Sequence, residues 1–92
     1  MQTLLLVDDE PNIVEGLASQ FEQRYGDGVI VLKSCSGRHA LSVLQNNRVD
    51  VVLSDIRMPD LDGLELIEET ERLWPRTHFV LLSGFEDFDY IH

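Results

Sequence analysis

Acidic residues gather at two places in this sequence where they could bind a metal ion. Asp8, Asp9 and Glu10 follow the apolar run Leu4–Val7, and Asp55 follows a second apolar run that is rich in valine. Adjacent carboxylates repel one another unless water screens them or a cation binds between them. Carboxylate oxygens are ligands that Mg²⁺ prefers. A carboxylate beside bound Mg²⁺ can accept a phosphoryl group, because the metal neutralises charge as the bond forms.

Each of these acids also has a purely structural interpretation. Asp8 or Asp9 could cap the first helix, because Asp side chains accept hydrogen bonds from backbone N–H groups at helix N-termini. Glu10 could be a first-turn acid that the helix dipole favours. We favour the metal site because Asp8 and Asp9, Asp55 and the hydroxyl of Ser83 fall at the ends of three separate predicted strands.

Short apolar runs predict four strands, over residues 3–7, 29–32, 49–54 and 79–82. The run at 3–7 is continuous rather than alternating, which is typical of a strand covered on both faces. Because the strands alternate with helical segments, we expect a parallel sheet with helices on both faces. In such sheets the ligand site lies beyond the carboxyl ends of the strands, where the acids and Ser83 fall.

Three helices are predicted between the strands. The first begins at Pro11, because proline suits the first turn of a helix, and it ends near Tyr25 before the turn at 26–28. The second is short and ends at Asn46. The third covers Leu64–Leu73 and carries an acidic outer face that we expect to be solvated.

The composition narrows the class of protein. The 92 residues suffice for one small domain, and 43% hydrophobic with 26% charged residues is ordinary for a soluble globular protein. No apolar run approaches the roughly 20 residues of a membrane span. The N-terminus lacks the basic region of a signal peptide, so we expect a cytoplasmic protein. The net charge of −10 argues against direct nucleic-acid binding and fits metal cations or a basic partner surface.

Cysteine and histidine carry little of the predicted chemistry. The single cysteine, Cys35, excludes an intramolecular disulfide, and we expect it to be partly buried, as free cysteines commonly are. His39, His78 and His92 share no helix face and no motif spacing. A structural zinc site needs four clustered ligands, so none is expected here.

Three motifs give the sequence a resemblance to a known family. The stretches "LLLVDDEP", "VVLSDIRMPDLDG" and "FVLLSG" have the order and spacing found in the receiver domain of two-component response regulators. The similarity covers essentially the whole chain, and "SDIRMPDLDG" is specific on its own. The resemblance implies a doubly wound, flavodoxin-like α/β fold with strand order 2-1-3-4. It also implies a signalling domain rather than an enzyme, with at most self-phosphorylation and autodephosphorylation.

The resemblance implies a role for each residue of the site. Asp55 would accept a phosphoryl group from a histidine on a sensor kinase. Asp9 would bind Mg²⁺ directly and Asp8 through water, with Asp55 and the backbone carbonyl of Arg57 as further ligands. Ser83 would be the switch hydroxyl that turns inward to bond to a phosphoryl oxygen. The phosphorylated domain would then switch an output domain of the parent protein.

The chain departs from the family at its C-terminal end. Receiver domains continue with a fifth strand and a fifth helix, and a lysine after that strand pairs with the phosphoryl group. The only lysine here, Lys33, does not match it. We therefore expect residues 1–92 to form an incomplete receiver domain with impaired phosphotransfer. The exposed edge of the fourth strand would favour self-association.

The last ten residues, "SGFEDFDYIH", resemble the segment of receivers that are fused to AraC-type helix-turn-helix domains. The output of the parent protein would then be DNA binding and transcriptional regulation. Two other functions stay open. A Mg²⁺-dependent phosphatase of the haloacid dehalogenase type would place an Asp where this chain has Arg57, which argues against turnover. A pseudo-receiver would bind partners without phosphorylation; the acids disfavour it, and the missing lysine keeps it open.

Overall fold

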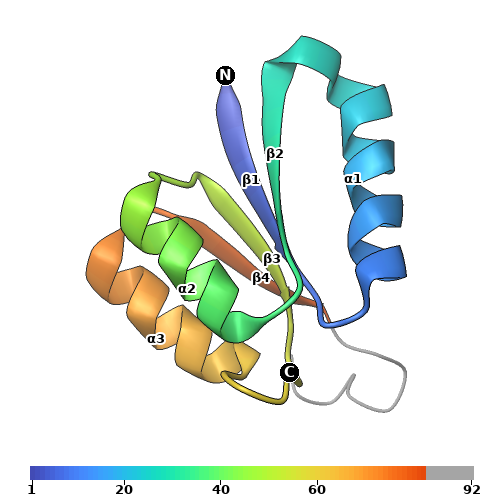
Figure 1. Cartoon of the computed structure of the whole chain (residues 1–92). Coiled ribbons are helices and arrows are strands. Elements are labelled where there is room, and N and C mark those ends of the chain that lie inside the picture. Colours follow the sequence, from blue (N-terminus) through green and yellow to red (C-terminus); the bar gives the residue numbers. More distant parts are fainter. Residues whose placement is uncertain (83–92) are drawn as a thin grey trace.

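The computed structural model describes residues 1–82 and shows a parallel sheet with helices on both faces (Figure 1). The strands are β1 (Gln2–Val7), β2 (Val29–Ser34), β3 (Val51–Asp55) and β4 (His78–Leu82). The helices are α1 (Pro11–Tyr25), α2 (Gly37–Asn46) and α3 (Gly63–Leu73), and a 3₁₀ turn, η1 (Gly26–Gly28), follows α1. The strand order β2-β1-β3-β4 confirms the predicted α/β fold and its topology.

Strand β1 lies in the middle of the sheet and contributes to two cores. Leu4 and Leu6 pack on one face with residues of α1, whereas Leu5 and Val7 pack on the other face, which α2 and α3 cover (Figure 1). Successive side chains of a strand point to opposite faces, so a strand covered on both sides must be apolar at every position. Burying each of these side chains stabilises the fold by roughly 1.5–3 kcal/mol.

The larger core lies between the sheet and the helix pair α2 and α3. Leu44 and Leu66 are fully buried there. The indole Nε1–H of Trp74, at the end of α3, donates to the carbonyl oxygen of Leu44 over 2.7 Å and ties the two helices together. The buried Thr70 hydroxyl donates to the carbonyl oxygen of Leu66 one turn earlier, so it needs no partner outside α3.

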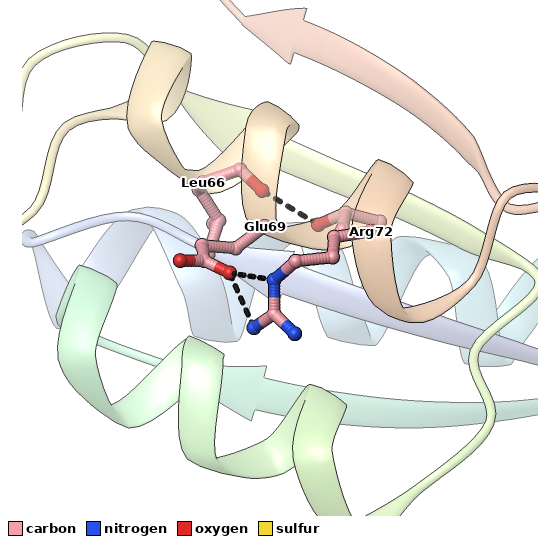
Figure 2. Close-up of polar contacts among 4 residues, drawn as sticks. Leu66, Glu69 and Arg72 are labelled. Atoms are coloured by element: carbon pink, nitrogen blue, oxygen red, sulfur yellow. Dashed lines mark hydrogen bonds and ion pairs between the residues drawn. The ribbon is translucent and has the colours of Figure 1, made fainter.

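The outer surface of α3 is charged, as predicted. Figure 2 shows the carboxylate of Glu69 against the guanidinium of Arg72, with Nη2 of Arg72 at 2.6 Å from Oε2 of Glu69. An exposed pair of this kind contributes only about 0–1 kcal/mol. Leu64, in the first turn of α3, is 50% exposed although it is apolar. It precedes the buried Leu66 by two residues, which places it roughly 200° around the helix.

Two strand boundaries differ from the predicted ones by two residues, and three others differ by a single residue. Strand β2 continues to Ser34 because it pairs with β1 as far as Val7. Strand β3 begins at Val51 instead of Val49. The N–H of Asp50 still donates to the carbonyl oxygen of Thr3 at 2.9 Å, but the N–H of Thr3 donates to the carboxylate of Asp50 at 2.7 Å and not to a backbone carbonyl.

Two further positions are more exposed than their residue types predict. Cys35 is exposed instead of partly buried, because it lies in the connection between β2 and α2. Ile13 is 44% exposed, at the border of the buried stripe of α1.

The expected exposure of the β4 edge involves the chain beyond residue 82, which lies outside the described residues, so it stays a prediction. No helix within residues 1–82 is long and apolar enough to cross a membrane.

Candidate metal and phosphoacceptor site

The carboxyl ends of β1 and β3 bring three aspartates together. Val7 and Ser54 are partners in neighbouring strands, so the next residues along the chain, Asp8 and Asp55, lie side by side at the edge of the sheet. One carboxylate oxygen from each of Asp8, Asp9 and Asp55 lies within 4.8 Å of the others. Oxygens around one Mg²⁺ ion, each at about 2.1 Å from it, lie at most about 4.2 Å apart. Small side-chain movements would therefore bring these oxygens close enough together to bind one Mg²⁺ ion.

Local hydrogen bonds orient the first of these acids. Oδ1 of Asp8 accepts a bond from the backbone N–H of Glu10 at 2.9 Å, which forms a tight turn after β1. Helix α1 has Glu10 at its N-cap, and no side chain caps it there. The alternative that Asp8 or Asp9 caps α1 is therefore wrong, and the turn holds Asp8 at the sheet edge instead.

Asp55 is the last residue of β3 and lies partly buried. Its Oδ1 accepts a bond from the backbone N–H of Ile56 at 2.8 Å. Ile56 is itself 5% exposed and anchors the start of the loop between β3 and α3. The carboxylate of Asp55 is thus held by its own backbone at the point where the strand ends.

The electrostatics of the cluster fit a cation site. The pKa of Asp8 is raised above its ordinary value of 3.8, first because burial disfavours the charged form and then because Asp55, Asp9 and Glu10 repel it. The hydrogen bond from the backbone N–H of Glu10 acts in the opposite direction. Three hard oxygen donors crowded in this way form a donor set that matches Mg²⁺.

Replacing Asp8 by Asn is expected to stabilise the metal-free chain at neutral pH. A raised native pKa means that folding costs free energy once Asp8 ionises. The penalty therefore develops as the pH rises from 3.8 through the raised pKa, and it persists above it. Asn keeps the acceptor oxygen for the N–H of Glu10. Thermal unfolding in EDTA should show a higher Tm for the variant at neutral pH and a vanishing difference in acid. An equal Tm at neutral pH would contradict the expectation.

The two remaining predicted site residues, Arg57 and Ser83, and the lysine that was excluded from the site, Lys33, lie in three different settings. Arg57 is exposed, and with Asp9, Met58 and Pro59 it lines an open depression beside the aspartates. Ser83, the predicted switch hydroxyl, lies outside the described residues. Lys33 is engaged elsewhere, because its Nζ lies 2.7 Å from Oε1 of Glu15 on α1. The hydrogen bond to Glu15 also raises the pKa of Lys33.

Asp60 makes contacts that no sequence motif reveals. Its carboxylate accepts hydrogen bonds from the backbone N–H groups of Gly37 at 3.1 Å and Arg38 at 3.0 Å, in the first turn of α2. These bonds, led by the one from Arg38, hold the pKa of Asp60 below its ordinary value. The partners lie 23 and 22 positions away, so a local pattern carries no signal for them. Asp62, by contrast, caps α3 by accepting from the N–H of Glu65, which is a recognisable local pattern.

The fold and the site define a doubly wound parallel α/β domain with a carboxylate cluster at the carboxyl ends of its central strands. Within that class the family is clear. The family model for the response regulator receiver domain matches residues 4–92, so the chain belongs to the receiver domain family. The resemblance inferred from the motifs is thereby confirmed.

Relatives and solved structures agree with the family. The uncharacterized transcriptional regulatory protein YesN of Bacillus subtilis is 34% identical over 90 residues, which cover 98% of this chain and 24% of that protein. The response regulator SaeR of Staphylococcus aureus is 38% identical, over 91% of this chain and 35% of that protein. A two-component transcriptional regulator AraC from Clostridium phytofermentans superposes with a TM-score of 0.86 at 28% identity, covering 98% of this chain and 73% of that one.

The chain spans only part of its curated relatives. It corresponds to about a quarter of YesN and about a third of SaeR. The functions of those whole proteins therefore also depend on regions that this chain does not share with them.

Proposed function

We propose that Asp55 receives a phosphoryl group from a histidine on a sensor kinase, with Mg²⁺ as cofactor. Receiver domains of response regulators are phosphoacceptor signalling domains, and this chain belongs to that family. The observation that carries the proposal is the convergence of carboxylate oxygens from Asp8, Asp9 and Asp55 within 4.8 Å. Their position at the carboxyl ends of parallel strands is where ligand sites form in such sheets.

The proposed metal ligands are Asp9 directly, Asp8 through water, Asp55, and the backbone carbonyl of Arg57. The raised pKa of Asp8 supports this assignment, because burial, and then repulsion from Asp55, Asp9 and Glu10, disfavour its charged form, and a bound cation would offset both effects. Bound Mg²⁺ would supply neutralisation of charge on the phosphoryl oxygens. Arg57 and Asp9 line the depression next to the cluster, which leaves space for a phosphoryl group there.

In the proposed transfer, a carboxylate oxygen of Asp55 attacks the phosphorus of a phosphohistidine and the imidazole nitrogen leaves. The product is an acyl phosphate on Asp55, and the chain has no catalytic turnover beyond its self-phosphorylation and slow hydrolysis. Ser83 would donate its hydroxyl to a phosphoryl oxygen afterwards. Arg57 occupies the position where a haloacid dehalogenase phosphatase would have its general acid, which supports a signalling role over phosphatase activity.

The output is proposed to be transcriptional. YesN is named as a transcriptional regulatory protein, and it extends far beyond the region matched here. The net charge of −10 makes this chain a poor surface for DNA, so a separate output domain of the parent protein would contact it. We infer that this chain provides receiver function to such a cytoplasmic protein.

The test is incubation with a small phosphodonor such as acetyl phosphate, read by intact-protein mass. In the presence of Mg²⁺ the chain, or a longer version that continues past residue 92, should gain the mass of one phosphoryl group. Chelating Mg²⁺ with EDTA should prevent the gain, because the carboxylate cluster alone repels the donor. Absence of any gain in both versions, or a gain that is indifferent to EDTA, would overturn the proposal.

A further inference from the structure

The loop between β3 and α3 is hydrogen-bonded to α2, a helix that the loop does not connect to directly. This loop, residues 56–62, carries Arg57 and comes directly after Asp55. Near its middle, the carboxylate of Asp60 bridges to α2 by accepting from the N–H groups of Gly37 and Arg38, at 3.1 and 3.0 Å. We call this contact the Asp60 bridge.

The backbones of the loop and of α2 approach closely at the Asp60 bridge. A Cβ atom added to Gly37 would lie 2.0 Å from the carbonyl oxygen of Leu61 and 2.6 Å from the Cβ of Leu61. No side chain larger than that of glycine fits between them. The loop is therefore seated on the first turn of α2, and the two surfaces cannot move independently without breaking this contact.

The remainder of the loop is held by the core. Ile56 and Met58, on either side of Arg57 in the sequence, are 5% and 7% exposed, whereas Arg57 itself is exposed. The N–H of Gly63 donates to the carbonyl oxygen of Ile56 at 2.8 Å, which closes the loop at its base. Asp60 supplies the attachment on the outer side, between these anchors along the chain.

Helix α2 does not depend on Asp60 for its N-cap. The hydroxyl oxygen of Ser36 already accepts from the backbone N–H of His39 at 3.1 Å, as an N-cap residue does. Asp60 adds bonds to two further N–H groups from a different element. Loss of the Asp60 bridge should therefore affect the position of the loop more than the stability of α2.

We propose that Asp60 is a positioning residue that holds the loop so that the backbone at Arg57 and the carboxylate of Asp55 suit metal binding. This inference rests on the proposed function, because it takes Asp55 and Arg57 as ligands. Asp60 does not touch the metal; it acts through the backbone of the loop. Groups that orient metal ligands in this way affect affinity although they stand outside the ligand set.

The test compares two variants, each of which removes hydrogen bonds to backbone N–H groups at the N-terminus of α2. Asp60→Ala removes the Asp60 bridge, and Ser36→Ala removes the N-cap bond of α2 without touching the loop. Calorimetric titration with Mg²⁺ should show about tenfold weaker binding for Asp60→Ala. Ser36→Ala should bind Mg²⁺ like the wild-type chain, although its Tm falls. Asp60→Asn, which keeps one acceptor oxygen, should lie between wild type and Asp60→Ala.

A second measurement is made at Mg²⁺ concentrations that saturate every variant, so that differences in metal affinity do not affect it. Because coupling between sites is reciprocal, Mg²⁺ should slow hydrogen exchange at the amides of Gly37 and Arg38 in the wild-type chain. In Ser36→Ala the same slowing should persist, and in Asp60→Ala it should disappear. This pattern separates a positioning role from a general loss of stability, which would alter exchange with and without Mg²⁺ alike.

The outcomes distinguish the two proposals. If wild type binds Mg²⁺ and Asp60→Ala binds it equally, or if Ser36→Ala loses as much affinity, the positioning role is wrong and the proposed function stands. If wild type does not bind Mg²⁺ at all, both proposals are overturned. Should Asp60→Ala fail to fold, Asp60→Asn and the exchange data on wild type and Ser36→Ala decide between these outcomes.

Discussion

Replacing Asp55 by Asn should abolish phosphorylation by a small phosphodonor and leave the fold intact. Asn lacks the anionic oxygen that attacks phosphorus, so no acyl phosphate can form. It retains Oδ1, which accepts from the backbone N–H of Ile56 at 2.8 Å in the native chain. Intact-protein mass after incubation with acetyl phosphate and Mg²⁺ should therefore stay unchanged, and the circular dichroism spectrum should match the wild type.

The same substitution should change metal binding and stability in opposite directions. Asp55 supplies one of three clustered carboxylate oxygens, so its loss should weaken Mg²⁺ binding by more than the roughly 10–100-fold that losing an outer-shell group costs. Its charge also contributes to the raised pKa of Asp8. Removing that charge relieves repulsion, so the metal-free variant should have a higher Tm than the metal-free wild type at neutral pH.

Asp27→Asn is the matched control for Asp55→Asn. Asp27 lies exposed in η1, outside the carboxylate cluster, and its replacement changes the net charge by the same amount. In whichever version of the chain the wild type gains one phosphoryl group, this control should gain it too, and it should keep the Mg²⁺ affinity of wild type. A phosphoryl gain in Asp55→Asn would show that another residue is the acceptor.

Replacing Gly37 by Ala should destabilise the chain strongly. The added Cβ would meet the carbonyl oxygen of Leu61 at 2.0 Å, and that oxygen belongs to backbone that cannot rotate away. Overpacking of this kind typically costs about 1–3 kcal/mol, and occasionally more. Urea unfolding should show the loss as a lower midpoint. Because the clash pushes the loop off α2, Mg²⁺ binding should weaken as well.

Gly16→Ala is the matched control for Gly37→Ala, because it adds the same methyl group at a position with free space. Gly16 is exposed within α1, and an added Cβ would meet no atom within 4 Å apart from its chain neighbours and the nearby backbone of its own helix. Alanine is favoured over glycine inside a helix by about 0.8–1.0 kcal/mol, so this variant should be stabilised. If both variants lost stability equally, the close approach between Gly37 and Leu61 would not be the cause.

The alternation of strand and helix and the place of the aspartates could be predicted from local patterns. The continuous apolar run in β1 indicated a strand covered on both faces, and Leu4, Leu5, Leu6 and Val7 are all buried. Asp8 comes directly after this run, and Asp55 follows the apolar residues of β3 with only Ser54 between them. Since carboxyl ends of parallel strands share one edge, their proximity was a consequence of the fold class.

Details that depend on partners far along the chain were beyond those patterns. The start of β3 depended on a side-chain bond between Asp50 and Thr3, 47 positions apart. The exposure of Leu64 and Cys35 depended on which faces the neighbouring elements cover. A hydrophobic pattern depends only on the residue types of one segment, and it does not indicate which other segment of the fold packs against each residue.

The sequence alone determined the α/β architecture, the receiver family resemblance and the gathering of Asp8, Asp9 and Asp55 at one end of the sheet. Only the tertiary structure decided that Asp60 bridges to α2 and that glycine is required at position 37. The reason is physical. Strand and helix periodicity and the rule for strand ends act within short segments, whereas hydrogen bonds and close backbone approach depend on the distances that packing sets between remote segments.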